Sequence, residues 1–253
     1  MHWIEKLQTP IIFGHRGASK YAPENTIAAF ELAMHQGADA FELDTMLSAD
    51  GIPVVIHDRT VERTTDGSGE VDQLSAKKLH AMDAGSTFSK EYSKERIPLL
   101  EEVLMIFKNR ALINIELKNY HHPFDTLPEK VVEIVNRVNV IDQLIFSSFI
   151  PLNLIKIKRL IPGAHVALLC LKGNLGYLSM SKAFSSVSPD YINPYFKDIS
   201  KSFIEKQHHM NRKVNTWVVN QQADMIELIN QGVDGIITDD PKLAHKIKCG
   251  MKK

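Results

Sequence analysis

Residues 11–44 read IIFGHRGASKYAPENTIAAFELAMHQGADAFELD, and this stretch decides the class of fold. It begins with a short apolar run at 11–13, continues as a helical pattern at 25–36 and, after Gly37, ends in a second apolar run at 40–43. Within the helical part, apolar residues recur at helical spacing, as Ile27, Phe30, Ala33 and Met34. A strand, a helix and a second strand in this order form a unit that is typical of a parallel sheet.

The same alternation continues to the end of the chain. Further short apolar runs lie at 54–56, 112–115, 144–146, 165–170, 191–193, 214–219 and 235–237. Helical patterns separate most of them, at 99–107, 129–138, 151–160, 200–210 and 223–230. If 40–56 is one strand with an extension, there are eight strands, which favours a closed (β/α)8 TIM barrel over an open doubly wound sheet. We therefore predict this α/β fold as a single domain over residues 1–253.

One region, residues 59–98, interrupts the alternation. It is rich in Thr, Ser, Gly and charged residues, as in RTTDGSGEV at 63–71. A structureless loop of this length is improbable inside a compact domain. We predict a small insertion after the second strand region, with short elements of its own, above the mouth of the barrel.

Composition excludes several classes of protein. The 253 residues include 30 Lys plus Arg and 30 Asp plus Glu, and the isoelectric point is near 7.2, which argues against a nucleic-acid partner. Two cysteines make no disulfide framework, which favours a reducing compartment. The start of the chain has no signal-peptide pattern, and no apolar run approaches the length of a membrane span. We expect a cytoplasmic protein with no membrane span.

Polar residues gather where the predicted strands end, which is where the active site of such a barrel lies. These segments are GHRG at 14–17, FELD at 41–44, HD at 57–58 and IELK at 115–118. They bring histidines, carboxylates, an arginine and a lysine to one rim.

Three carboxylates in this set suggest a metal site. Glu42 and Asp44 are one residue apart, so both point to the same face of a strand, and Glu116 adds a third carboxylate. Oxygen ligands without sulfur suit Mg2+ or Ca2+. Alone, such a pair of acids is more often solvent-facing, but Glu116 and the nearby histidines favour a cation site.

His15 and His57 are candidates for general acid and base, because imidazole titrates near neutral pH. A single histidine is more often a core or surface residue. Two of them at strand ends, beside an acidic cluster and two cations, favour catalysis.

Arg16 and Lys118 can bind phosphate oxygens, or they can form salt bridges with the neighbouring carboxylates. Trp217 can form an apolar wall for part of a substrate or belong to the core.

The motifs together resemble those of the bacterial glycerophosphodiester phosphodiesterases of the cytosolic type. The resemblance extends over nearly the whole chain and rests on the order and spacing of ten blocks: HRG at 15–17, PENT at 23–26, ELD at 42–44, HD at 57–58, RTTDGSGEV at 63–71, RIPLLEEVL at 96–104, IELK at 115–118, SSF at 147–149, NTWVVN at 215–220 and DGIITDDP at 234–241.

The resemblance implies a TIM barrel with an insertion after the HD motif. It also implies a hydrolase of lipid and glycerol metabolism that converts glycerophosphocholine or glycerophosphoethanolamine to sn-glycerol 3-phosphate and an alcohol. The family's residues correspond to metal ligands at Glu42, Asp44 and Glu116, catalytic histidines at His15 and His57, phosphate-binding cations at Arg16 and Lys118, and walls of the glycerol pocket at Phe149 and Trp217.

The resemblance further implies one divalent cation, Mg2+ or Ca2+. Glu24 and Asn25 of the PENT block are expected to shape the first loop, with Asn25 as the cap of the following helix. Two alternatives are a phosphodiesterase that acts on lysophospholipids and a non-catalytic barrel that binds glycerol phosphate.

Overall fold

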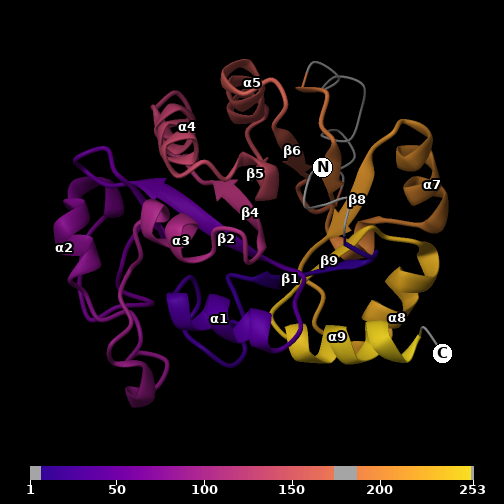
Figure 1. The fold of residues 1–253 in the computed structure, drawn as a ribbon, viewed down its shortest axis with the longest axis horizontal. Helices are drawn as coiled ribbons and strands as arrows, with labels where there is room; N and C mark the ends of the chain where they lie inside the picture. The colour runs from indigo at the N-terminus through magenta and orange to yellow at the C-terminus, as the bar shows by residue number, and fades with distance from the viewer. Residues whose placement is uncertain (1–6, 174–186, 252–253) are drawn as a thin grey trace.

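Eight parallel strands close into a barrel because β1 pairs with β2 on one side and with β9 on the other (Figure 1). The structure is a computed structural model and describes residues 7–173 and 187–251. The barrel strands are β1 (Ile11–His15), β2 (Ala40–Leu47), β4 (Leu112–Leu117), β5 (Leu144–Ser148), β6 (His165–Leu169), β7 (Tyr191–Asn193), β8 (Lys213–Thr216) and β9 (Gly235–Thr238). The predicted (β/α)8 fold is confirmed.

Helices surround the strands on the outside of the barrel (Figure 1). They are α1 (Ile27–His35), α3 (Leu100–Ile106), α4 (Leu127–Val138), α5 (Pro151–Leu160), α7 (Lys201–His209), α8 (Gln222–Gln231) and α9 (Pro241–Gly250). Buried aromatic rings tie two of these helical regions to the barrel: Phe41 on β2 stacks on Phe30 at 4.4 Å and meets Phe107 edge-on at 4.8 Å. Burial of each ring stabilises the fold by about 1.5–3 kcal/mol, and this packing fixes the orientation of β2.

The barrel interior is apolar in its lower part. Its buried side chains are Ile11, Phe13, Ala40, Leu112, Ile145, Ala167, Tyr191 and Ile237. Side chains on one face of a strand recur every two residues, so Ala40 is followed on the inward face by Glu42 and Asp44. The acids therefore lie above an apolar floor, at the carboxyl end of the barrel.

The predicted extension of the second strand is wrong in one respect, because it is a separate strand that runs backwards. β3 (Pro53–Val55) pairs antiparallel with the end of β2, with Thr45 opposite Val55 and Leu47 opposite Pro53. The next amide, of Ile56, donates to the Asp44 carbonyl at 3.1 Å. This hairpin returns the chain to the barrel mouth, where His57 follows.

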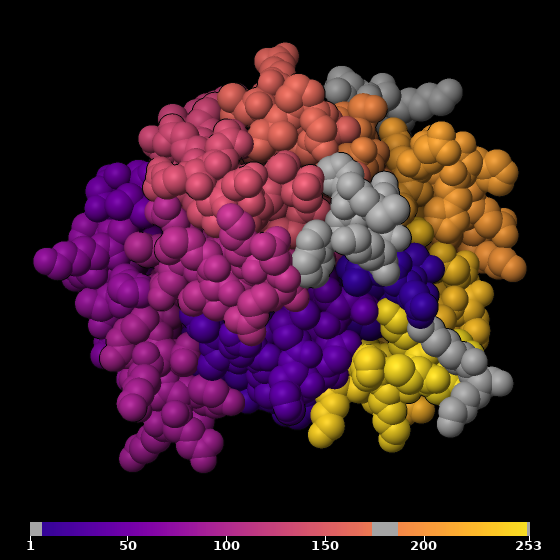
Figure 2. Space-filling model, in the orientation of Figure 1, coloured from indigo at the N-terminus to yellow at the C-terminus, as the bar shows by residue number. Residues whose placement is uncertain are grey.

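Between β3 and α3, the chain forms α2 (Ala76–His80) and two 3-10 helices, Val71–Gln73 and Lys90–Tyr92. These elements pack around an apolar cluster of their own, which includes Val54, Ile56, Val61, Val71, Leu79, Met82 and Ile97. In Figure 2 this region runs from the left edge to the lower left of the molecule. None of the described helices is long and apolar enough to cross a membrane.

Candidate active site

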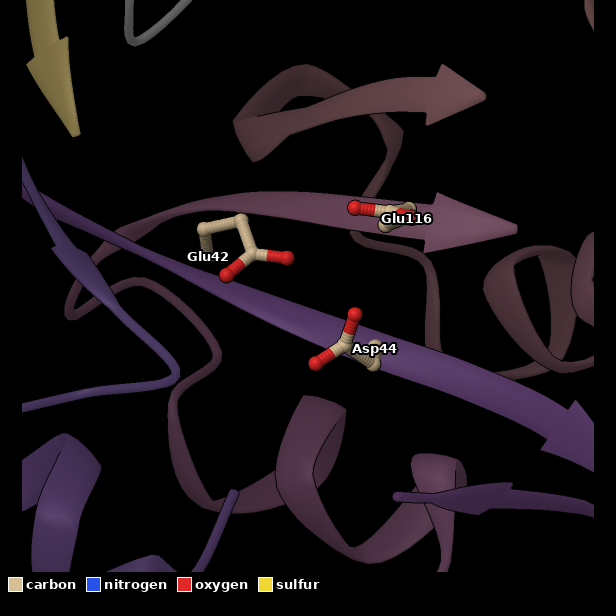
Figure 3. A group of neighbouring side chains, drawn as sticks. All are labelled: Glu42, Asp44 and Glu116. Carbon is tan, nitrogen blue, oxygen red and sulfur yellow. The ribbon is translucent and has the colours of Figure 1, made fainter. Parts of the chain in front are cut away.

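Glu42, Asp44 and Glu116 lie side by side at the carboxyl end of the barrel (Figure 3). The register of the sheet brings them together, because Asp44 on β2 is directly opposite Glu116 on β4. One carboxylate oxygen from each lies within 4.8 Å of the others. Glu42 and Asp44 are 3% and 1% exposed, so water screens their charges poorly.

The three carboxylates differ in their electrostatic surroundings. Burial, Asp44 and Glu116 together raise the pKa of Glu42 well above its usual range. Burial also acts to raise the pKa of Asp44, but Lys118 and Arg16 outweigh it and hold that pKa well below its usual range. The nearby cations therefore outweigh burial at Asp44, whereas at Glu42 burial and the two neighbouring carboxylates outweigh the favourable effect of Arg16.

This arrangement fits a hard divalent cation. Oε1 of Glu42 is buried and has no hydrogen-bond partner within the described ranges, which is costly unless another group approaches it. A cation among the three oxygens would bind that atom. It would also offset the burial and the repulsion that raise the pKa of Glu42. Carboxylates alone, without sulfur, suit Mg2+ or Ca2+.

His15 is the last residue of β1, and Arg16 begins the sharp turn that follows this strand. Arg16 and Gly17 both have left-handed backbones, with φ of 55° and 87°. A Cβ on Gly17 would come within 2.5 Å of the Ala29 carbonyl carbon on α1, so only glycine fits here. The turn also directs the Arg16 amide at Glu42 Oε2, 3.1 Å away.

His15 is held by a residue from the other end of the chain. Its Nδ1 lies 2.6 Å from Oδ1 of Asp239, which directly follows β9. Ser19 and Asn220 donate hydrogen bonds to the same carboxylate. Burial acts to raise the pKa of Asp239, but the His15 contact and these donors outweigh it and lower the pKa to about 2. The pair fixes the His15 ring.

His57 has an equivalent partner in its neighbour. Its Nδ1 lies 2.6 Å from Oδ1 of Asp58, whose other oxygen accepts a hydrogen bond from Arg63. Partial burial opposes the change, but Arg63 and His57 lower the pKa of Asp58 to about 2. Both histidines thus engage a carboxylate through Nδ1, and both line the same cleft.

The two predicted phosphate-binding cations pair with the carboxylates. Nε of Arg16 is 3.2 Å from Asp44, and Nζ of Lys118 is 3.5 Å from Asp44 and 3.4 Å from Glu116. Both cations also line the cleft. The salt bridges expected of these residues are thus confirmed.

The cleft is open to solvent and has a volume of about 520 Å3. Of the predicted site residues, it is lined by all except Asp44, which is buried behind the two cations. Its apolar side includes Phe149 and Trp217, whose rings meet edge-on at 5.7 Å. Nε1 of Trp217 donates to the Asn193 carbonyl at 2.8 Å, which fixes the indole.

Four polar residues near the site were assigned no such role from the sequence: Asn25, Arg63, Tyr120 and Asp239. The prediction that Asn25 caps the first helix is wrong, because Thr26 caps it by accepting from the Ala29 amide. Asn25 instead has φ of 58° and donates to Asp44 at 2.8 Å. Tyr120 donates to Glu116. Asn25, Arg63 and Asp239 lie within the motif blocks quoted above, and their place in those blocks was the sequence signal that could have identified them.

Comparison with known proteins gives a consistent result. The model of the glycerophosphoryl diester phosphodiesterase family matches residues 15–243. The glycerophosphodiester phosphodiesterase of Caldanaerobacter subterraneus subsp. tengcongensis is 37% identical over 233 residues, which cover 92% of this chain and 95% of that protein. A glycerophosphodiester phosphodiesterase of Bacillus altitudinis is 35% identical over 246 residues, which cover 95% and 99%.

Solved structures agree. A phosphodiesterase of Oleispira antarctica, in complex with the product sn-glycerol-3-phosphate, superposes with a TM-score of 0.86 at 29% identity, covering 96% of this chain and 97% of that one. A glycerophosphodiester phosphodiesterase of Agrobacterium tumefaciens gives 0.81 at 28% identity, with coverage of 93% and 98%. With its barrel fold and its cleft of paired histidines and carboxylates, this chain belongs to the glycerophosphoryl diester phosphodiesterase family and is a glycerophosphodiester phosphodiesterase.

Proposed function

We propose that this enzyme hydrolyses deacylated phospholipids, such as glycerophosphocholine and glycerophosphoethanolamine, to sn-glycerol 3-phosphate and an alcohol. One observation carries the proposal: two carboxylate-held histidines line the same cleft as a cation-competent acidic trio. The product complex of the Oleispira antarctica relative supports the same product here.

The phosphodiester binds between Arg16 and Lys118, whose positive charges contact its two non-bridging oxygens. Glu42, Asp44 and Glu116 would hold Mg2+ or Ca2+, which when bound stabilises the negative charge that develops on phosphorus oxygens. Phe149 and Trp217 enclose the carbon skeleton of the glycerol. The site thus separates a polar half for the phosphate from an apolar half for glycerol.

His15 and His57 form the acid and base pair. Because each ring uses Nδ1 for its carboxylate, Nε2 is the atom available to the substrate. One histidine accepts the proton of the attacking oxygen, and the other donates a proton to the departing alcohol oxygen as the P–O bond breaks. The attacking oxygen belongs either to water or to the free hydroxyl of glycerol. The second route gives a cyclic phosphate, and water must then break one of its P–O bonds to yield sn-glycerol 3-phosphate.

We also propose that residues 1–253 are one domain with 59–98 as its insertion, and that the enzyme works in the cytoplasm. The apolar cluster of the insertion supports the first statement, because it also includes Val54 on β3 and Ile56 directly after that strand. The two cysteines, too few for a disulfide framework, support the second, because they favour a reducing compartment.

A coupled assay for sn-glycerol 3-phosphate tests the function. The purified chain is assayed on glycerophosphocholine, glycerophosphoethanolamine and lysophosphatidylcholine, after chelation and again with Mg2+ or Ca2+ restored. Release of the head-group alcohol is measured alongside, because the same cleavage of lysophosphatidylcholine gives choline and an acylated glycerol phosphate. We expect release only from the two glycerophosphodiesters and only with metal. Activity that survives complete chelation would contradict the metal site, and preferred release from the lysolipid would contradict the substrate class.

A further inference from the structure

Arg63, in the insertion, touches two carboxylates of the active-site rim that come from different loops. Both terminal nitrogens of its guanidinium donate to Glu24, each at 2.7 Å. Its Nε donates to Asp58. Glu24 precedes α1, whereas Asp58 follows β3, so one side chain joins two loops that are separated by more than thirty residues.

Each of these carboxylates also holds a group that works on the substrate. Glu24 Oε1 accepts from NH1 of Arg16 at 2.8 Å, and Asp58 Oδ1 lies 2.6 Å from Nδ1 of His57. Arg63 is therefore the midpoint of a continuous chain of contacts that runs from Arg16 through Glu24 and Asp58 to His57.

The planar fork of arginine is required at this midpoint. Three nitrogens of one guanidinium serve three carboxylate oxygens at the same time, a geometry that a lysine ammonium cannot reproduce. The side chain of Arg63 is 49% exposed, so its pairs contribute little to overall stability. Its effect is expected in the orientation of the groups it reaches rather than in the free energy of folding.

We propose that Arg63 is a positioning residue for the reaction, which orients the phosphate-binding Arg16 through Glu24 and the catalytic His57 through Asp58. The inference rests on the proposed function of that site. It assigns a role to the insertion: the insertion supplies the side chain that holds the two halves of the cleft in register. Loss of this side chain loosens substrate binding and the chemical step together.

The test compares the variant R63A with the wild type on glycerophosphocholine. We expect kcat to fall by about 10- to 100-fold, because misplacement of a catalytic group by a fraction of an ångström to 1 Å has effects of this order. We expect KM to rise severalfold, because Arg16 loses its fixed position. R63K should remain closer to R63A than to the wild type. Metal affinity, measured by calorimetry, should not change, because Arg63 contacts none of the three proposed ligands.

The chain offers a matched control in Arg110. This residue is also 49% exposed and also donates two hydrogen bonds to one glutamate, Glu31, at 2.9 and 2.8 Å, but it precedes β4 at the opposite end of the barrel. R110A should leave kcat and KM unchanged. The melting temperatures of R63A and R110A should agree within a few degrees, and R63Q replaces R63A if R63A alone melts early.

Double-mutant cycles separate positioning from a general disturbance. If Arg63 acts through its two partners, R63A combined with D58N should lower kcat no further than the more severe single change, and R63A combined with E24Q should raise KM no further. Multiplicative effects would overturn the proposal, as would an R63A or R63K enzyme within twofold of the wild type. A wild-type enzyme inactive on every diester would instead refute the proposed function.

Discussion

Glu42 shows, at the scale of one residue, that a buried cation-binding carboxylate costs stability when no cation is bound. The carboxylate is buried beside Asp44 and Glu116, and its pKa is raised by burial and by those two charges. A carboxyl group with a raised folded-state pKa contributes stability below its ordinary pKa, and that contribution is lost as pH rises. At neutral pH the Glu42 carboxyl group therefore makes the metal-free chain less stable than it is below that ordinary pKa.

The substitution E42Q tests this balance. In chelator at pH 7 we expect the melting temperature of E42Q to rise by a few degrees above that of the wild type, and this gain should vanish near pH 4. Affinity for Mg2+ or Ca2+, measured by calorimetry, should fall by about 100-fold, because an amide is a weaker ligand than a carboxylate. Glu133 on α4 is exposed, so E133Q is the control. A less stable metal-free E42Q would contradict the account.

The histidines give a second prediction at this scale. H15A and H57A should each lower kcat by about 100- to 10,000-fold, the usual contribution of a general acid or base. Metal affinity should stay within a few fold, because neither ring belongs to the acidic trio. His209 is exposed on α7, and H209A should retain full activity. Near wild-type turnover of either H15A or H57A would exclude the two-histidine mechanism.

At the scale of elements, the turn between β1 and α1 determines where His15 and Arg16 point. Gly17 and Gly51 both have positive φ, of 87° and 73°. A Cβ on Gly17 would collide with α1, whereas a Cβ on Gly51 would meet no atom within 4 Å. Replacing each glycine with alanine therefore separates two costs. Alanine at Gly51 adds backbone strain alone, whereas alanine at Gly17 adds strain and a steric clash.

We expect G51A to lower the free energy of unfolding by about 1 kcal/mol, the strain of a left-handed alanine. G17A should lower it by more than about 2 kcal/mol and should also reduce turnover, because α1 or the turn must move. Urea denaturation and the coupled assay measure both effects. Equal stabilities of the two variants would show that the close approach of α1 is not decisive.

The strand β3 shows what the residue pattern of an element does and does not contain. Its apolar run at 54–56 was recognised, but its direction was not. A run of three apolar residues satisfies either a parallel or an antiparallel neighbour, and only pairing with the end of β2 selects between them. The reversal explains how His57 reaches the mouth without standing at the end of a barrel strand.

At the scale of the whole molecule, two paired carboxylates affect stability in acid: Asp239 contacts His15, 224 positions away, and Asp58 contacts His57 and Arg63 in its own loop. The pKa values of Asp58 and Asp239 are lowered to about 2, although burial opposes this, because hydrogen bonds and cations favour their charged forms. A lowered folded-state pKa contributes stability above the ordinary value of 3.8, which is lost as pH falls through about 2.

We therefore expect the free energy of unfolding of the wild type to fall between pH 4 and pH 2. Each group should account for about 1 kcal/mol, a value reduced from the full shift because both side chains are about a third exposed. The free energy of unfolding of D239N should fall correspondingly less over this range, as measured by urea titrations monitored by circular dichroism. A D239N profile parallel to that of the wild type would contradict the assigned contact.

The sequence by itself determined the alternation of strands and helices along most of the chain, the closed barrel, and which residue types meet at its carboxyl end. It did so because periodicity and strand ends are local properties of the chain. Only the tertiary structure decided which polar side chains contact one another. Asp239 holds His15 from 224 positions away, Asn25 binds Asp44 instead of capping a helix, and Arg63 joins two loops. Such contacts depend on barrel closure and strand register, which bring together side chains that no local pattern relates.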